Sequence, residues 1–401
     1  MKAVSWERRS LGRCAKFLSG GTPDKSRSDY WDGDIPWVSS GEMKETRLYD
    51  TPLHITAEAA EEGSRVVSAN TVLAVVRGMS LAKEFRVAIT KRDMAFNQDL
   101  KACACEPDID SEFLFYAMLA RCEHIRELAT EASHGTKKLE TEVLANVLVL
   151  VPKLDVQRRV VEVIATYDDL IENNRRRMAL LEEAARQLYR EWFIRLRFPG
   201  HEHTRISNGM PKGWERKALA DLADVNRESL GGSFDGEIEY VDIASVTPGQ
   251  ISETSTYEFR DAPSRARRVV RHGDIIWSCV RPNRRSYAVI WQPPTNLVVS
   301  TGFAVLTPRS VPTTFLYCAT TTDAFVGYLE NHARGAAYPA VVAGDFERAE
   351  VCVPSRSLLA SFNDPVEPTF SQVHNLRLQN KRLRAARDLL LPRLMSGEIA
   401  V

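Results

Sequence analysis

The chain has 401 residues, of which 44% are hydrophobic and 26% are charged, and its basic and acidic side chains balance at 53 each. This composition is typical of a folded globular protein and excludes a disordered or fibrous one. The length leaves room for two or three domains. Because the formal net charge is zero, any surface that binds nucleic acid must be local.

The sequence carries no recognisable targeting or membrane signal. The N-terminal segment 1–13 is charged and has no apolar core, unlike a signal peptide. No stretch approaches the roughly 18 apolar residues of a membrane-spanning helix. The seven cysteines follow no metal-ligand spacing and fit a reducing compartment. We therefore expect a soluble, cytoplasmic protein without a metal site or membrane contact.

The N-terminal region predicts a mixture of short strands and helices. Apolar runs at 66–76, 85–89 and 143–151 are typical of strands, whereas 110–129 predicts a helix. These elements together predict an α+β domain, which we place at residues 1–153.

The segment 154–197 predicts a long helix with one apolar seam. Apolar residues recur at alternating intervals of three and four, as in a coiled coil. A single asparagine interrupts the seam, which costs stability but can fix register and partner. The seam residues are Ile164, Tyr167, Ile171, Asn174, Met178, Leu181, Leu188 and Trp192.

A linker at 198–213, rich in Pro, Gly, Asn and Ser, precedes a second copy of the first region. The matched pairs are 6–11 (WERRSL) with 214–219 (WERKAL), 33–38 (GDIPWV) with 236–241 (GEIEYV), 113–115 with 315–317, and 151–152 with 353–354. In both copies an apolar strand ends in an arginine, Arg77 in the first and Arg281 in the second. Since all matches keep their order, we expect a similar domain over 214–356.

The segment 357–401 predicts a second long helix with the same three-four spacing. Its seam contains one asparagine and one arginine, Arg387. The seam residues are Val373, Leu376, Asn380, Leu383 and Leu390. The predicted class is therefore α+β, with two similar domains and two long projecting helices.

Basic and amide side chains near the two strand ends are the candidates for DNA contact. Arginine can contact guanine O6 and N7 bidentately or clamp a phosphate. Small residues beside them let a backbone approach the DNA, and lysines neutralise phosphates. The candidates are Arg77, Lys101, His134, Lys137, Lys138, Arg281, Asn283, Arg284, Arg285, Arg334 and Tyr338. A solvated basic loop or an ordinary turn is the alternative for each of them, and for the segment 97–101, which contains Lys101, we favour a structural turn.

We find no complete catalytic motif in the sequence. It contains no P-loop, no [DNS]PP[YFW] loop of an amino-methyltransferase and no HExxH. One alternative is a single-chain nuclease that holds a metal ion on Asp108, Asp110 and Glu112, although these acids fit a helix start better. Another is a pseudo-symmetric scaffold with two protein-binding heads. We predict a DNA-binding protein that is not an enzyme.

Several segments closely resemble specificity subunits of type I restriction-modification systems. Those in the central region are 155–159 (DVQRR), 167–177 (YDDLIENNRRR) and 188–193 (LYREWF). The turn 20–23 (GGTP) followed by 33–38 resembles the opening of a target-recognition domain of this family, and 377–397 resembles its distal region. The second repeat departs from this pattern, because it lacks GGTP.

The resemblance implies two target-recognition domains separated by two long helices that form an antiparallel coiled coil. Each domain would read one half of a bipartite, asymmetric target in double-stranded DNA. The helices would recruit two methyltransferase subunits, which use S-adenosylmethionine, and restriction subunits, which use ATP and Mg²⁺. The resemblance implies no cofactor on this chain itself.

Overall fold

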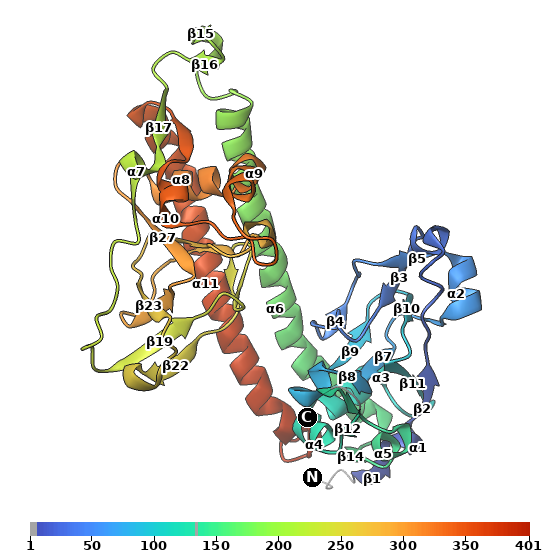
Figure 1. Ribbon diagram of the computed structural model, residues 1–401. Coiled ribbons are helices and arrows are strands. Elements are labelled where there is room, and N and C mark those ends of the chain that lie inside the picture. The colour runs from blue at the N-terminus through green and yellow to red at the C-terminus, as the bar shows by residue number, and fades with distance from the viewer. Residues whose placement is uncertain (1–5, 133–134) are drawn as a thin grey trace. The chain divides into compact units, whose positions relative to one another are not determined.

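Two long helices are the longest elements of the computed structural model, which describes residues 6–132 and 135–401 (Figure 1). They are α6 (Leu154–Tyr189), which continues into a π-helix at Arg190–Ile194, and α11 (Arg356–Met395). The chain divides into unit 1, which is Met1–Glu172 with Asn380–Val401, and unit 2, which is Asn173–Gln379. Each unit therefore contains a part of both long helices.

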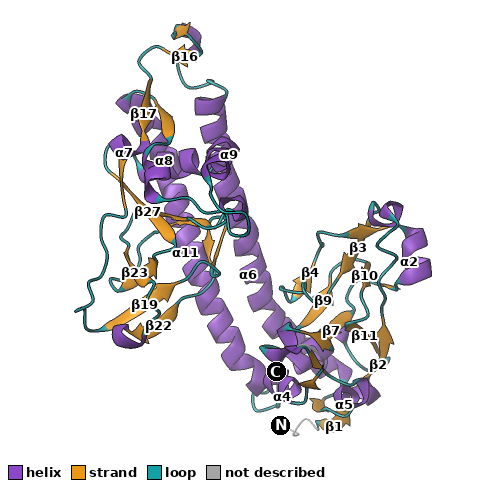
Figure 2. Ribbon diagram, in the orientation of Figure 1, coloured by secondary structure: helices purple, strands orange, loops and turns teal. Residues whose placement is uncertain are grey.

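The strands and short helices of unit 1 form head 1, which we define as residues 7–151. Figure 2 shows that this region mixes strands with short helices. Its helices are α1 (Leu11–Cys14), α2 (Ala57–Gly63), α3 (Ser111–Leu119), α4 (Cys122–Glu127) and α5 (Thr141–Ala145). Its strands are β1 (Glu7–Ser10), β2 (Ala15–Ser19), β3 (Ile35–Val38), β4 (Arg47–Leu48), β5 (His54–Ile55), β6 (Val66–Val67), β7 (Val72–Val75), β8 (Arg77–Gly78), β9 (Val87–Thr90), β10 (Met94–Phe96), β11 (Leu100–Cys105), β12 (Thr130–Glu131), β13 (Lys137–Lys138) and β14 (Leu148–Val151).

Head 2, residues 215–353, has the same mixed composition in unit 2. Its helices are α7 (Leu219–Leu222), α8 (Thr313–Thr320), α9 (Asp323–His332) and α10 (Ala343–Glu347). Its strands are β17 (Glu215–Ala218), β18 (Ala223–Val225), β19 (Glu237–Val241), β20 (Val246–Thr247), β21 (Gln250–Ile251), β22 (Ser255–Glu258), β23 (Ala266–Val269), β24 (Ile275–Ser278), β25 (Tyr287–Val289), β26 (Leu297–Ser300), β27 (Phe303–Pro308) and β28 (Glu350–Val353). A small hairpin of β15 (Ile206–Ser207) and β16 (Met210–Pro211) precedes it.

Strand order and register repeat between the two heads. Head 1 has sheets ordered β2-β11-β7-β9-β4 and β5-β3-β10-β6, and head 2 has sheets ordered β18-β27-β24-β25 and β22-β19-β26-β23. The pairs β3–β10 and β19–β26 are both parallel. The first and last strands of each head also pair alike, with Glu7 opposite Val151 and Glu215 opposite Val353. The repeat in the sequence is thus a repeat of backbone pairing.

Three predicted elements of head 1 differ in the structure. The predicted strand 66–76 is interrupted, because Asn70 adopts a left-handed conformation with φ of 64°. The predicted helix 110–129 is two helices, of which α3 is buried on most of its surface and α4 buries only Ile125. The region 143–151 begins with helix α5 and only then becomes strand β14. Apolar runs of this length do not distinguish a buried helix from a strand.

The two long helices run antiparallel. In unit 1, Asn380 of α11 donates a hydrogen bond to the Ile171 carbonyl of α6 (3.1 Å). In unit 2, Arg377 pairs with Glu182 (2.7 Å). The contact partner of a later residue in α6 is therefore an earlier residue in α11, as expected for antiparallel helices. This arrangement confirms the predicted α+β class with two long packed helices.

The predicted seam residues all lie on the covered side of the helices. The buried ones are Ile164, Ile171, Asn174, Val373, Leu376 and Asn380. Those of intermediate burial are Tyr167, Met178, Leu181, Leu188, Trp192, Leu383 and Leu390. In the part of the chain that the structure describes, no helix is long and apolar enough to cross a membrane.

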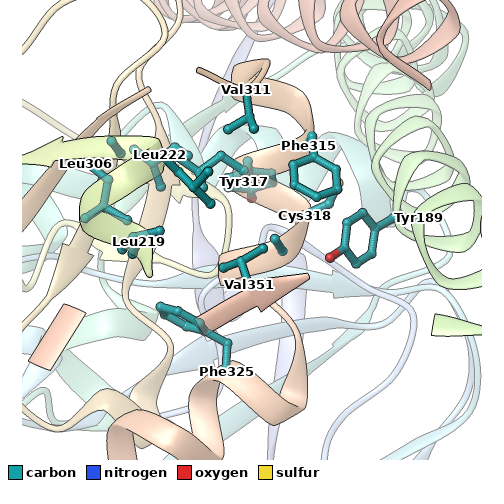
Figure 3. Packing of buried hydrophobic residues seen from close by; sticks show 14 of the residues in the cluster. Tyr189, Leu219, Leu222, Leu306, Val311, Phe315, Tyr317, Cys318, Phe325 and Val351 are labelled. Atoms are coloured by element: carbon teal, nitrogen blue, oxygen red, sulfur yellow. The ribbon is translucent and has the colours of Figure 1, made fainter. Parts of the chain in front are cut away.

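An aromatic cluster joins α6 and α11 to head 2 within unit 2. Figure 3 shows Tyr189 of α6 facing Phe315 of α8, and their ring centroids are 5.7 Å apart. Phe362 of α11 is fully buried, and its ring lies 6.0 Å from Tyr189 and 5.1 Å from Phe193. Burial of such rings is a large apolar contribution to stability. Head 2 is therefore held on the helices by a continuous core.

Candidate nucleic-acid interface

In head 1, a buried strand ends at a small basic sheet. All four residues of β7 are buried, and the chain reaches the surface at Arg77 in β8. β8 pairs with β13, so that Arg77 lies opposite Lys138, and Gly78 opposite Lys137. Lys138 is balanced by Glu140 at 2.5 Å. We call Arg77, Met79, Lys137 and Lys138 corner 1.

The same construction recurs in head 2. Strand β24 is buried throughout, and Val280, just beyond its end, bridges to Ala340, which also bridges to Arg334. The backbone N–H of Arg281 donates to the Pro339 carbonyl (2.7 Å). We call Arg281, Asn283, Arg284, Arg334 and Tyr338 corner 2. In both heads the end of a core strand thus meets a loop from much later in the sequence.

Arg281 is held in a defined position. It has a left-handed backbone with φ of 51°, and its guanidinium carbon lies 4.6 Å from the centre of the Tyr338 ring. One guanidinium nitrogen also donates to the Ala337 carbonyl (3.3 Å). Stacking on an aromatic ring restrains an arginine while leaving its outer N–H groups free to donate. This arrangement suits contact with a base edge or a phosphate.

The remaining candidates lie in different surroundings. Asn283 and Arg284 are exposed in the 3-10 turn Pro282–Arg284, next to Arg281. Arg285 instead forms an ion pair with Asp323 at the start of α9 (2.6 Å). That contact gives Arg285 a role in holding the turn. His134 lies outside the described residues.

Lys101 is not part of corner 1. It lies in β11 opposite Ala74 of β7, in the five-stranded sheet. Its ammonium group contacts the Ser19 hydroxyl at 2.5 Å. Lys101 thus belongs to another sheet than the small one that joins Arg77 to Lys137 and Lys138, although Asp99, two residues before it, accepts a hydrogen bond from the Arg77 N–H.

Met79 lies in corner 1 and was not among the candidates predicted from the sequence. Its side chain is 74% exposed beside Arg77, and Tyr338 in corner 2 is 69% exposed. Large apolar side chains surrounded by positive charge can contact base faces or thymine methyl groups. The available signal was an apolar residue just after the strand-ending arginine, in a Gly- and Ser-containing loop.

The acids considered as metal ligands are engaged in other contacts. Asp108 pairs with Arg9 (2.6 Å), and Asp110 accepts a hydrogen bond from the Phe113 N–H at the start of α3 (3.0 Å). Glu112 pairs with Lys91. Among residues 6–132 and 135–401, no group of three or more His, Cys, Asp or Glu side chains is placed to hold a metal ion.

Comparison with known proteins gives one consistent family. Residues 3–183 match the family model described as Type I restriction modification DNA specificity domain. Over 99% of its length the chain is 25% identical to the type I restriction enzyme MjaIX specificity subunit of Methanocaldococcus jannaschii, of which 94% is covered. It is also 30% identical over 169 residues to the EcoR124I/EcoR124II specificity subunit of Escherichia coli, covering 42% of this chain and 41% of that one.

A solved structure shares the fold. The crystal structure of a type I restriction-modification S subunit from M. genitalium superposes with a TM-score of 0.57 at 14% identity, covering 98% of this chain and 97% of that one. The similarity extends over both heads and both long helices, and it agrees with the family match. Over nearly its whole length the chain is thus similar to specificity subunits of type I restriction-modification systems, and residues 3–183 match the DNA specificity domain of that family.

Proposed function

We propose that this chain reads the two halves of a bipartite, asymmetric DNA target, one half with each head. The observation that carries the proposal is the recurrence of one backbone arrangement, corner 1 and corner 2, with different side chains. Corner 1 presents an arginine, two lysines and a methionine, whereas corner 2 presents three arginines, an asparagine and a tyrosine. Different side chains on one scaffold favour two unlike half-sites.

The proposed division of labour assigns residues 1–153 and 214–356 to target recognition. Residues 154–197 and 357–401 form the helical spacer, and 198–213 connect the spacer to head 2. In each corner the cations would neutralise phosphates, and the arginine at the strand end would contact a base edge. Because the net charge of the chain is zero, DNA binding would depend on such local positive surfaces.

The long helices are the proposed docking surface for partner subunits. Leu180 of α6 is 71% exposed and Leu389 of α11 is 74% exposed. Single exposed leucines are common on protein surfaces, so the proposal rests mainly on the similarity of this chain to specificity subunits. We propose that two methyltransferase subunits, carrying S-adenosylmethionine, and the ATP- and Mg²⁺-dependent restriction subunits assemble on this cytoplasmic chain.

The proposal is tested by selection from random duplexes. The chain is purified with its methyltransferase subunit and challenged with double-stranded DNA of random sequence. We expect two short specified segments separated by an unspecified gap of fixed length, and an affinity that falls steeply with salt. Enrichment of no sequence by an intact complex would contradict the proposal and favour a protein-binding scaffold.

A further inference from the structure

A partly buried polar network joins head 1 to the long helices inside unit 1. Arg47 of β4 pairs with Asp169 of α6 and donates a second hydrogen bond to the Tyr116 hydroxyl (3.3 Å). Tyr116 of α3 in turn donates to one carboxylate oxygen of Asp168 (2.7 Å). The other oxygen of Asp168 accepts from Arg387 of α11 (2.6 Å). We call these five residues latch 1.

Latch 1 is covered from solvent at its centre. The side chains of Asp168, Arg47 and Arg387 are only 5%, 10% and 14% exposed. Burial, together with the Asp168 carboxylate, raises the pKa of the Tyr116 phenol, so this hydroxyl stays protonated and can donate. Every contact therefore matches a donor with an acceptor across three parts of the unit: head 1, α6 and α11.

A second network occupies the corresponding junction in unit 2. Arg377 of α11 pairs with Glu182 of α6 and donates to the carbonyl of Gly249 (2.8 Å). Gly249 lies in the turn between β20 and β21 with φ of 76°, and a Cβ there would lie 3.1 Å from the Tyr317 hydroxyl. The turn of head 2 is thus fitted closely against α8 and the helices. We call Arg377, Glu182 and Gly249 latch 2.

Networks of this kind restrict geometry more than they stabilise. Removing charges from water is costly, and well-packed apolar residues often give equal or greater stability at the same place. Hydrogen bonds between charged groups, however, are lost when the partners shift, whereas apolar contacts tolerate small sliding movements. A head attached through such a network has one favoured orientation on its helices.

We propose that latches 1 and 2 are positioning elements that fix the angle of each head on the helices and so restrict the DNA target to one gap length. This inference rests on the proposed function. Neighbouring base pairs lie about 3.4 Å apart, so a head that rocks by a few ångströms at the DNA surface would accept a gap one base pair longer or shorter. The latches would set spacing, and the corners would set sequence.

The test uses the intact complex with its methyltransferase subunit and duplexes in which both half-sites are constant and the gap varies by one base pair. The variants are Arg387→Met and Tyr116→Phe in latch 1 and Arg377→Met in latch 2. Arg393→Met is the matched control, because Arg393 lies on the same helix in an ion pair with Glu398 that is more than half exposed on both sides.

Wild type and the Arg393→Met control should prefer one gap by at least about tenfold, since a wrong gap misplaces a whole half-site. The latch variants should bind the neighbouring gaps within about threefold of the original one, while substitutions inside either half-site remain as harmful as before. Tyr116→Phe removes only one hydroxyl group, so we expect this variant to fold. It tests latch 1 if the Arg387→Met variant assembles poorly.

Two results would overturn the inference. One is a folded latch variant that keeps the wild-type preference for a single gap, and the other is a variant that loses discrimination within a half-site but not between gaps. A wild-type complex with no split target would instead contradict the proposed function itself. The wild-type measurement therefore separates failure of the latch from failure of the underlying proposal.

Discussion

Head 1 and head 2 carry side chains of very different size at one equivalent position of their corresponding sheets. Ala74 lies opposite Lys101 in head 1, and Trp277 lies opposite Ala304 in head 2, at equivalent places in the strand order. Both side chains are fully buried. The Trp277 ring packs 4.7 Å from Tyr287 and contacts the aromatic rings of α9 and α10, where head 1 has only a methyl group.

The difference shows that the two repeats keep the same backbone pairing even where their core side chains differ. Cores tolerate extensive exchange of apolar residues when volume and pattern are kept. In both heads the strand still ends in an arginine beside a late loop, at Arg77 or Arg281. In a scaffold of this kind, residues in the core and residues on the binding surface can vary independently.

The largest effect should come from removing the aromatic filling of head 2. Trp277→Ala leaves a cavity in a fully buried position and should lower the free energy of unfolding of unit 2 by about 3–5 kcal/mol. Hydrogen exchange of the amides in β24 and β27 measures this loss locally. The control Val342→Ala, at a side chain of head 2 that is 56% exposed, should change stability by no more than about 0.5 kcal/mol. Unchanged protection of head 2 would contradict the assignment of Trp277 to its core.

A smaller effect should distinguish the two corners on DNA. Arg281→Ala removes the arginine stacked on Tyr338 and should cost about 1–3 kcal/mol of discrimination in one half-site only. Arg77→Ala should do the same in the other half-site. Competition binding with duplexes altered in either half measures both. Equal loss of specificity in both halves from one substitution would argue against separate reading by the heads.

A lysine of corner 1 should act on affinity more than on sequence. Lys137→Gln removes one positive charge next to Arg77 and should reduce the slope of log affinity against log salt by about 1. Binding should weaken equally for all sequences. Lys217→Gln is a charge-matched control, because Lys217 is already paired with Glu215 at 3.0 Å. A slope that falls equally in both variants would show that corner 1 has no special role.

The smallest effect concerns an acid that head 2 has and head 1 lacks. Burial raises the pKa of Asp274, which occupies the place of Thr71 in head 1, since the carbonyls of both residues accept a hydrogen bond from the neighbouring strand. The folded state then binds the proton more tightly than the unfolded state. Head 2 should become more stable as the pH falls from neutrality through this raised pKa. Asp274→Asn should flatten the pH profile measured by urea unfolding, and an unchanged profile would contradict the assignment.

Patterns in the sequence were sufficient to predict the two long helices, the repeat and the strands that end in arginine. Apolar residues such as Ile164 and Ile171 in α6, or Val373 and Leu376 in α11, form a seam because side chains three and four apart share one face of a helix. The order of matched segments predicts two similar heads. The seams depend on residues close together in the chain, and the repeat can be found by comparing the sequence with itself.

Contacts between distant segments could not be predicted in the same way. Nothing near Arg285 indicates its ion pair with Asp323, and nothing near Arg47 indicates that it reaches Asp169. Arg77 and Lys138 are likewise far apart in the sequence, and only the pairing of β8 with β13 brings them together. The matching loops of the two repeats indicated which segments form the corners. The contacts that make up the latches could be identified only in the folded structure.

The most direct test of the central claim is a map of methylated adenines in cells that express this chain with its methyltransferase subunit. Single-molecule sequencing of their genomic DNA should reveal one split motif with a constant gap. Arg77→Ala should relax one half of that motif and Arg281→Ala the other. A continuous, unsplit motif, or a split motif in which both halves depend on the same head, would contradict the account.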